Sequence, residues 1–416
     1  MMLYLAVIAL LLALIFLGTQ VVWAWRLALC YPPAESPAPA DELPRAAVVL
    51  SVRGADPSLV DCLRGLLRQD YPDYEVHIII DSEHDPAWEL LRPLLDEAGT
   101  TPVRLHLLET KYETCSLKLS ALAQAIGELD TSVRVVALID ADVIPYAEWL
   151  HDLVRPLADP QVGAATGLRW YLPESNDWGS LVRCLWNAAA ISQQLAFRIP
   201  WGGSLAFRAD QLRGPGLLDA WKHSFCEDTV SYGVLKRLGL RVHFVPAATM
   251  VNPESIELKH CLSFIRRQML CVRLHHPRWR VVRALGVGAA FTLGLVAAVL
   301  VASLALGDFL AAGLMMGTLA TFAVTMASAL LWIDNSLRLT ARRRGETLAA
   351  SSWKLALAAP LTQIVYLGAL VSVSFLRSVD WRGVTYELNG TTPVRLTAYH
   401  PYTPAPVGAN HPASVL

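Results

Sequence analysis

Four long stretches without charged residues frame a middle region of different character. The first covers residues 1–25 and is long enough to span the hydrocarbon core of a bilayer. Later stretches of the same kind cover residues 284–307, 309–333 and 355–376. A cleaved signal peptide would start with basic residues and end at a small-residue site, so the first stretch predicts an uncleaved anchor. Between these stretches lie about 250 residues of soluble character, enough to bury a core of their own.

Within the middle region, short apolar runs alternate with helical patterns. Strands are predicted at residues 46–52, 75–81, 103–109 and 134–140, and helices at residues 58–69, 87–98 and 116–129. This alternation is typical of an α/β fold in which helices cover both faces of a parallel sheet. Ligands of such folds bind outside the carboxyl ends of the strands, so functional residues are expected at that edge.

These patterns divide the chain into six segments. We expect a membrane anchor (1–29), a linker rich in Pro and Ala (30–45), the α/β domain (46–252), basic interfacial helices (253–283), membrane or interfacial segments (284–376) and a tail (377–416). The Pro-rich end of the tail, after Tyr399, is expected to be disordered.

Basic residues beside the apolar stretches predict the orientation in the membrane, because Lys and Arg near membrane ends stay in the cytoplasm. Arg26 and the Arg-rich stretches 266–283 and 338–344 therefore place the α/β domain on the cytoplasmic side of a multi-pass cell-membrane protein. The last apolar stretch contains Pro360 and Gln363 and leaves two alternatives. It lies in the interface or re-enters, which keeps the tail inside, or it crosses and places the tail outside.

The overall composition agrees with a membrane protein and excludes some functions. Hydrophobic residues make up 54% of the chain and charged residues 17%, which is too apolar for a soluble protein of this length. The net charge of −1 does not favour a nucleic-acid partner. The seven cysteines show no Cys-x-x-Cys spacing, which suits reduced thiols and indicates no zinc site. The composition does not indicate an oligomeric state.

The most informative local motif is the acidic pair Asp140 and Asp142, which follows the apolar run at residues 135–139. Carboxylates two residues apart at the end of a strand emerge on one side and can share a divalent ion with the phosphates of a ligand. Mg²⁺ or Mn²⁺ is the expected ion. Acidic pairs also end many strands by chance, so the motif gains weight only from its surroundings.

Other polar residues are expected at the same edge of the sheet. Arg53 and Gly54 follow the first predicted strand, Asp81 ends the second, and Lys118 lies on the third helix. Gly54 permits a tight turn, while Arg53 and Lys118 offer positive charge to a ligand. Taken singly, the two cations could be solvated surface charges and Asp81 a helix cap. Taken together, they favour a nucleotide-binding crevice.

A second acidic pair, Glu227 and Asp228, follows a glycine-rich turn that includes Gly203. A sugar transfer with inversion needs a carboxylate that accepts the proton of the attacking hydroxyl, and Asp228 is the candidate for this base. The alternative is a carboxylate that stabilises the start of a helix at residues 230–238 through the helix dipole. Both roles are compatible.

These motifs, in this order, resemble family 2 type glycosyltransferases, and within them the ceramide glucosyltransferase-like branch that includes hopanoid-associated lipid glycosyltransferases. The similarity covers roughly residues 1 to 390. It rests on residues 52–57 (VRGADP), residues 69–72 (QDYP), Asp81, Asp140 with Asp142, Glu227 with Asp228, and residues 380–386 (DWRGVTY). The fold that the resemblance implies is the nucleotide-diphospho-sugar transferase (GT-A-like) fold.

The resemblance also implies roles for individual residues. Asp81 would contact the uracil or ribose of a UDP-sugar, and Asp140 would help to hold the nucleotide. Asp142 would bind the metal that bridges the diphosphate, where the ion offsets charge on the leaving UDP. Asp228 would be the general base and Glu227 would shape the acceptor site. Residues 201–204, which include Gly203, would form the floor on which donor sugar and acceptor meet.

One stretch departs from the family pattern. The family carries Gln or Arg, two further residues and then Arg-Trp on the helix after the base, but here Arg267 and Gln268 are followed by Leu270-Cys271 or Cys271-Val272. The diphosphate would then be met by Arg267 or Arg273. The alternative is a juxtamembrane basic helix attracted to anionic lipid, at about 1 kcal/mol per charge near the surface.

The sequence therefore predicts an inverting, metal-dependent hexosyltransferase that moves a sugar, glucose by resemblance, from a UDP-sugar to a membrane lipid. A domain held against the bilayer by an anchor before it and spans after it favours a lipid acceptor. A processive polysaccharide synthase is the first alternative, disfavoured by the missing Trp and the few polar residues in the spans. A membrane scaffold with weakened catalysis is the second alternative, motivated by the missing Arg-Trp.

Overall fold

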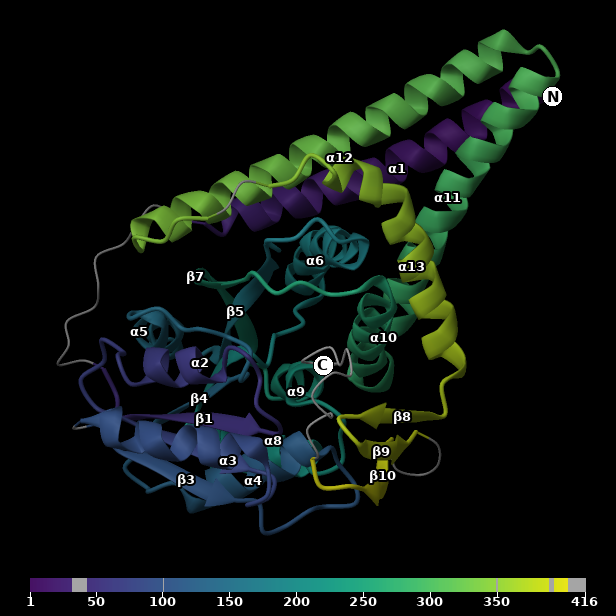
Figure 1. The fold of residues 1–416 in the computed structure, drawn as a ribbon. Helices are drawn as coiled ribbons and strands as arrows, with labels where there is room; N and C mark the ends of the chain where they lie inside the picture. Colours follow the sequence, from purple (N-terminus) through teal and green to yellow (C-terminus); the bar gives the residue numbers. More distant parts are fainter. Residues whose placement is uncertain (32–42, 100, 349–350, 389–392, 403–416) are drawn as a thin grey trace.

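The computed structural model describes residues 1–31, 43–99, 101–348, 351–388 and 393–402 (Figure 1). Most of the predicted linker and the end of the predicted tail lie outside these ranges. The centre of the molecule is a seven-stranded sheet in the order β3-β2-β1-β4-β6-β5-β7. Its strands are β1 (Ala46–Val52), β2 (Tyr74–Ile80), β3 (Val103–Leu107), β4 (Val135–Ile139), β5 (Val162–Tyr171), β6 (Ser204–Arg208) and β7 (Arg241–Asn252).

The sheet is parallel except at β6, which runs antiparallel to both of its neighbours, β4 and β5. The central strands are apolar on both faces, as parallel strands covered on both sides must be. On β1, Val48 and Leu50 belong to one hydrophobic core, whereas Ala47 and Val49 belong to the other. The predicted α/β class, with helices on both faces of a largely parallel sheet, is confirmed.

The helices of this domain fill the two cores. α2, α3 and α5 pack in the core on one face, while α4, α8 and α9 pack in the core on the other. The domain helices are α2 (Leu59–Leu66), α3 (Pro86–Leu91), α4 (Leu117–Glu128), α5 (Trp149–Val154), α6 (Trp178–Phe197), α7 (Ala209–Arg213), α8 (Leu217–Trp221), α9 (Glu227–Arg237) and α10 (Leu258–His275), with 3₁₀ segments η2 (Arg92–Ala98) and η3 (Arg155–Ala158).

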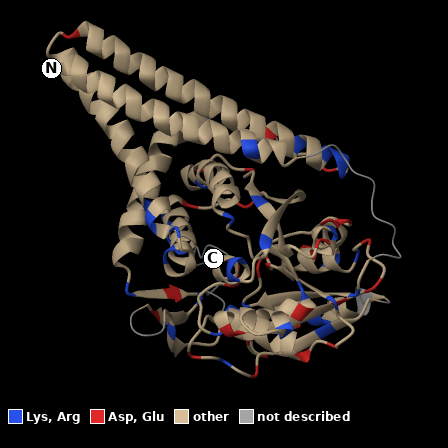
Figure 2. Ribbon diagram, turned by 180° about the vertical axis from the view of Figure 1, so that it is seen from behind, with Lys and Arg blue, Asp and Glu red and all other residues tan. Residues whose placement is uncertain are grey.

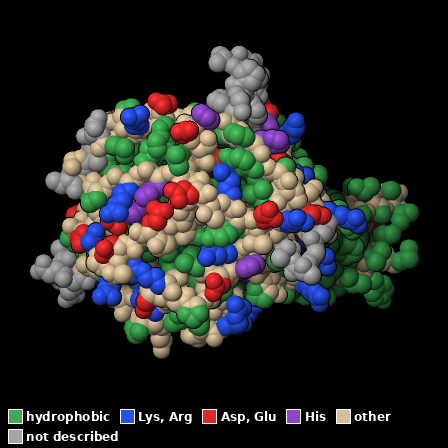
Figure 3. Space-filling model, turned by 90° about the horizontal axis from the view of Figure 1, so that it is seen from below, with side chains coloured by type: hydrophobic (Ala, Val, Ile, Leu, Met, Phe, Trp, Pro, Cys, Tyr) green, Lys and Arg blue, Asp and Glu red, His purple; other side chains and the backbone are tan. Residues whose placement is uncertain are grey.

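In the described part of the chain, four helices are long and apolar enough to cross a membrane: α1 (Met2–Leu29), α11 (Trp279–Ala305), α12 (Phe309–Arg343) and α13 (Leu355–Phe375). α1, α11 and α12 form an arm that projects from the domain (Figure 1). Lys and Arg gather where the arm meets the domain, and the rest of the arm lacks them (Figure 2). Seen from below, the protruding arm is largely hydrophobic, whereas the domain surface carries mixed charges (Figure 3).

A second, three-stranded antiparallel sheet follows α13 and consists of β8 (Ser378–Trp381), β9 (Val384–Glu387) and β10 (Arg395–Tyr399). It packs on the α/β domain next to the start of α4. The hydroxyl of Tyr386 accepts a hydrogen bond from the backbone N–H of Leu117 at 3.0 Å, and the N–H of Leu396 donates to the carbonyl of Glu113 at 2.7 Å. The segment expected to be a tail thus begins with an ordered sheet that touches the carboxyl edge of the main sheet.

Candidate active site

A cavity lies at the carboxyl ends of the central strands, with an empty volume of about 1160 Å³ that includes open solvent. Arg53 follows β1, Asp81 follows β2 and Asp140 follows β4, so parallel strands bring distant parts of the sequence to one edge. The cavity is lined by all the predicted site residues except Gly203, namely Arg53, Asp81, Lys118, Asp140, Asp142, Glu227, Asp228, Arg267 and Gln268.

The acidic pair after β4 is neutralised by two cations. Lys118 Nζ lies 2.7 Å from Asp140 Oδ1, and Arg169 of β5 makes two contacts with Asp142, at 2.8 and 2.9 Å. Arg169 also reaches Asp140 Oδ2 at 3.3 Å. Burial alone would raise the pKa of Asp140, but Lys118 and Arg169 hold it below its ordinary value. All four carboxylate oxygens of the pair therefore contact a cationic side chain.

The carboxylates of Asp140 and Asp142 suit a divalent ion, provided that the Arg169 guanidinium moves away from Asp142. Mg²⁺ and Mn²⁺ sites of this type use one or two carboxylates together with phosphate oxygens of the ligand, and not a cage made by the protein alone. Accordingly, the described residues contain no group of three or more His, Cys, Asp or Glu that could hold a metal. Because Arg169 covers both oxygens of Asp142, its guanidinium must shift before an ion can bind that carboxylate.

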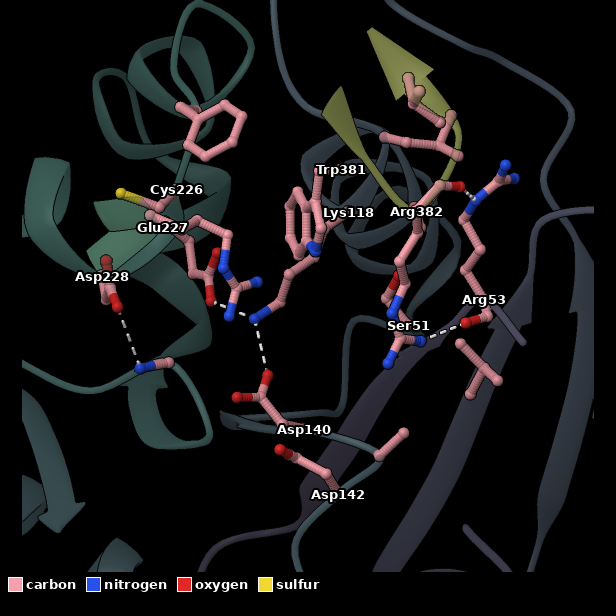
Figure 4. Close-up of a pocket in the computed structure, with 18 of the residues that line it drawn as sticks. Ser51, Arg53, Lys118, Asp140, Asp142, Cys226, Glu227, Asp228, Trp381 and Arg382 are labelled. Atoms are coloured by element: carbon pink, nitrogen blue, oxygen red, sulfur yellow. Dashed lines mark hydrogen bonds and ion pairs between the residues drawn. The ribbon is translucent and has the colours of Figure 1, made fainter. Parts of the chain in front are cut away.

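Glu227 and Asp228 begin α9 and lie in different surroundings (Figure 4). Glu227 is buried and binds Lys118 Nζ at 2.6 Å, and the burial raises its pKa above the ordinary value. The carboxylate of Asp228 is more exposed; it accepts hydrogen bonds from the backbone of Gly202 at 3.4 Å and from the hydroxyl of Thr229 at 2.9 Å. Lys118 thus engages Glu227, whereas Asp228 has no cationic partner in the described structure.

Lys118 contacts two carboxylates at once: Asp140 after β4 and Glu227 at the start of α9 (Figure 4). Burial alone lowers the pKa of a lysine, yet the two carboxylates raise it well above its ordinary value. Lys118 therefore stays charged and links the end of β4 to the start of α9. The surface-charge alternative for Lys118 is wrong.

Arg267 differs from the other cations in the cavity wall. Its guanidinium faces the rings of Trp381 and Phe264, at 5.0 and 6.0 Å, and no hydrogen bond or ion pair to it is found among the described residues. Burial without a partner lowers its pKa. The Arg267 side chain is half-buried and its Nε is fully buried without a partner, so the cavity offers an uncompensated positive charge to an anionic ligand.

The far end of the cavity is built around Asp81. Its Oδ2 contacts Arg53 Nη1 and accepts a hydrogen bond from the hydroxyl of Tyr399 at 3.2 Å. Its Oδ1 is buried and has no hydrogen-bond partner. Asp81 is therefore not the cap of the following helix; that cap is Asp85, whose carboxylate accepts a hydrogen bond from Ala87.

Two residues considered from the sequence lie elsewhere. Gly203 packs behind the cavity, where an added Cβ would lie 2.3 Å from the Trp201 ring and 2.7 Å from Asp140 Oδ2, so it allows close packing and does not line the ligand space. Gly202 is the glycine that lines the cavity. Arg273 points away and donates a 2.9 Å hydrogen bond to the carbonyl of Leu376 after α13. Arg267 is thus the arginine of α10 that lines the cavity.

Several further residues line the site without having been assigned a role from the sequence, and three of them carry rings or charges that face the cavity region. They are Arg169, Trp381 and Arg382. Arg169 leaves a signal in the sequence, because it is a lone charge inside the otherwise uncharged run 162–172. Trp381 and Arg382 lie in the conspicuous motif at residues 380–386, but only the folded chain brings that motif to the cavity.

A largely parallel sheet with an acidic pair after β4 and a carboxylate at the start of a later helix defines a GT-A-like glycosyltransferase fold. The model of Glycosyl transferase family 21 matches residues 4–393. The chain belongs to this family. The expectation of a family 2 type enzyme was coarser, since it names only the wider group, while the ceramide glucosyltransferase-like resemblance agrees with the relatives below.

Two curated relatives match part of the chain. A ceramide glucosyltransferase of Pyricularia oryzae is 33% identical over 103 residues, and one of Gibberella zeae is 28% identical over 131 residues. These matches cover 23% and 29% of this chain but only 21% and 24% of the relatives' own lengths. Among solved structures, a mannosyltransferase from Pyrobaculum calidifontis, in complex with GDP-Man and Mn²⁺, has a TM-score of 0.55 at 20% identity, covering 89% of this chain and 99% of that one. This similarity supports the fold.

Proposed function

We propose that this protein transfers a hexose, in the first instance glucose, from a UDP-sugar to the hydroxyl of a membrane lipid, with inversion at the anomeric carbon. The sugar and the lipid class follow the partial relatives, which are named ceramide glucosyltransferases. The observation that carries the proposal is the cavity itself, in which an unpaired cation, Arg267, shares one space with the candidate base, Asp228.

Charge complementarity supports a nucleotide diphosphate as the ligand. Every other arginine or lysine that lines the cavity contacts a carboxylate, and only Arg267 has no such partner among the described residues. A diphosphate would supply that charge and would meet the acidic pair after β4 through an ion. When bound, Mg²⁺ or Mn²⁺ would be held by Asp142 and Asp140 and would offset negative charge on the departing diphosphate.

The chemical step follows from the position of Asp228. The lipid hydroxyl attacks the anomeric carbon, its proton passes to the Asp228 carboxylate, and the bond from the anomeric carbon to the phosphate oxygen breaks as UDP departs. Hydrogen bonds from Gly202 and Thr229 hold the carboxylate, and no cationic side chain contacts it in the described structure. Glu227, held by Lys118, helps to shape the acceptor side.

The membrane arrangement supports a lipid acceptor and a topology with three crossings. After α12, Arg344 donates hydrogen bonds to the carbonyls of Ala247 and Thr249 in β7, at 2.9 and 3.0 Å. After α13, Arg382 contacts Asp56 of the same domain at 2.7 Å. Because the residues that precede and follow α13 contact one domain, we infer that this helix lies in the interface or re-enters, and that the tail stays on the side of the domain. The charge distribution favours the cytoplasm for that side (Figure 2).

The proposal is tested with purified protein in detergent, supplied with Mg²⁺ or Mn²⁺, a panel of UDP-sugars, and sphingoid, hopanoid and diacylglycerol acceptors. We expect mass spectrometry to find one hexose added to one of the lipids. Product size separates a single transfer from chain extension, which the polysaccharide-synthase alternative requires. If the protein neither transfers sugar nor hydrolyses donor, and binds UDP equally with and without metal, the scaffold alternative holds instead.

A further inference from the structure

The C-terminal sheet (β8, β9 and β10) contacts the loop after β1 through two arginines, Arg382 and Arg53, each of which donates to the backbone carbonyl of the other. Arg382, in the turn between β8 and β9, donates hydrogen bonds from its guanidinium to both oxygens of Asp56, at 2.7 and 3.0 Å, and to the carbonyl of Arg53. In return, Arg53 Nε donates to the carbonyl of Arg382 at 2.8 Å. The side chains of Arg382 and Asp56 are only 15% and 6% exposed, so this pairing is largely screened from water.

The same contacts determine how Asp81 is held. The guanidinium of Arg53 has its remaining nitrogens on the carbonyl of His400 and on Asp81 Oδ2, and Tyr399 donates its hydroxyl to the same oxygen. The ring of Tyr399 also lies under the Arg53 guanidinium, 5.3 Å from it. Asp81 Oδ2 thus has two partners, Arg53 and Tyr399, and the buried Oδ1 remains as the acceptor without a partner.

Arg382 and Gly383 are the two central residues of the hairpin turn between β8 and β9, where Trp381 pairs with Val384. Arg382 has a φ of 51°, and a positive φ at this position is what a two-residue type I′ hairpin turn requires. Gly383 follows with a φ of 76°, and the turn directs the Arg382 side chain toward the domain (Figure 4). The hairpin turn thus places Arg382 where its guanidinium reaches Asp56 and the backbone carbonyl of Arg53.

We propose that the C-terminal sheet is part of the donor site, with Arg382 and Tyr399 as positioning residues that hold Arg53 and Asp81 in the orientation that receives the nucleoside of the donor. This inference rests on the proposed function, because it assumes that the nucleoside binds at Asp81. It assigns a role to the strands β8, β9 and β10, which lie more than three hundred positions after β1 in the chain. The diphosphate end of the donor, at Arg267, is expected to be independent of this sheet.

The test compares two ligands that differ by the nucleoside. Calorimetry measures the Kd of UDP and of inorganic pyrophosphate, each with Mn²⁺, for the full-length wild type and for Arg382→Gln, Tyr399→Phe and Arg395→Gln. Arg395 is exposed on β10 and serves as a control with the same loss of charge on the same sheet. We expect the Kd of UDP to rise about tenfold or more in Arg382→Gln and about threefold in Tyr399→Phe, as loss of one or a few hydrogen bonds predicts. The Kd of pyrophosphate should stay within about twofold in both, and Arg395→Gln should match the wild type.

A purely structural role for the sheet would give a different result. It would lower the thermal unfolding midpoint and weaken UDP and pyrophosphate equally, or weaken neither, and either outcome overturns the inference. If Arg382→Gln does not fold, Tyr399→Phe decides alone, because it removes one hydroxyl and keeps the ring. Absence of UDP binding by the wild type would overturn the proposed function as well, which separates the two failures.

Discussion

The two walls of the cavity differ in how their charges are balanced. On the wall after β4, Asp140 and Asp142 have every oxygen in contact with Lys118 or Arg169. On the wall formed by α10 and β8, Arg267 has no anionic partner among the described residues. The charges of the first wall are balanced without a ligand, whereas the charge of Arg267 on the second wall is not. Under the proposed function, the ligand brings negative charge to Arg267, and an ion binds Asp142 only after the Arg169 guanidinium moves.

The largest expected effect comes from removing the base that lies between these walls. Asp228→Asn should lower sugar transfer by about 10²–10⁴-fold, because the attacking hydroxyl loses its proton acceptor. The Kd of UDP should remain unchanged, since Asp228 contacts only Gly202 and Thr229 in the described structure. Transfer rates and calorimetry on the same preparations check this expectation. Asp219→Asn, on the exposed part of α8, is the control, and wild-type transfer by Asp228→Asn would refute the assignment.

The next effect tests the unpaired wall. Arg267→Gln should raise the Kd of UDP by about 10- to 100-fold, the range expected for loss of hydrogen bonds to a charged group. Arg266→Gln is the matched control, since the neighbouring arginine lines a separate small cavity and not the main one. Equal losses in both variants would mean that Arg267 contributes only general positive charge.

The opposite wall is tested by removing the ion. Asp142→Ala should weaken both UDP binding and transfer, roughly tenfold or more for binding in the presence of Mn²⁺. Chelation of the ion with EDTA should reduce wild-type UDP affinity to that of the variant and have no further effect on the variant. Additive losses would show that the ion binds somewhere other than Asp142.

The smallest expected effect concerns how the stability of the folded protein depends on pH through His275 of α10. Burial lowers the pKa of His275 to about 4, and its neutral Nε2 accepts a hydrogen bond from the N–H of Phe225 at 2.9 Å. Between pH 6.5, near the unfolded pKa, and pH 4, the unfolded chain binds a proton that the folded chain does not, so stability falls as the pH falls through this window. In His275→Gln the amide oxygen accepts the same bond without titrating. The loss in unfolding midpoint from pH 6.5 to 4 should therefore be smaller, by on the order of a few degrees; an identical loss would exclude His275 as the cause.

Much of the fold could be predicted from the sequence because its first half follows simple periodicity. The strands β1, β2, β3 and β4 lie within a few residues of their predicted positions. The strands β5, β6 and β7 were not predicted. β5 carries Gly163, Thr166, Gly167 and Arg169 among its apolar residues, and β7 contains Pro246 and shifts register against β5, so neither shows a clean strand pattern.

The candidate site was predictable only where it follows strand ends. Asp81, Asp140 and Asp142 could be found because the carboxyl edge of a parallel sheet collects such residues. Arg382 and Tyr399 could not, because nothing local in the chain indicates that a sheet following a membrane helix returns to β1. Long-range packing of this kind leaves no periodic signal.

The central claim is that a nucleotide diphosphate binds between these two walls beside Asp228. A structure of the protein with UDP and Mn²⁺ tests it most directly. We predict the diphosphate within hydrogen-bond distance of Arg267, the ion on Asp142 with Arg169 turned away, and Asp228 facing the open space beyond the terminal phosphate. UDP bound outside the cavity, or inside it with the phosphates away from Arg267 and Asp142, would contradict the account.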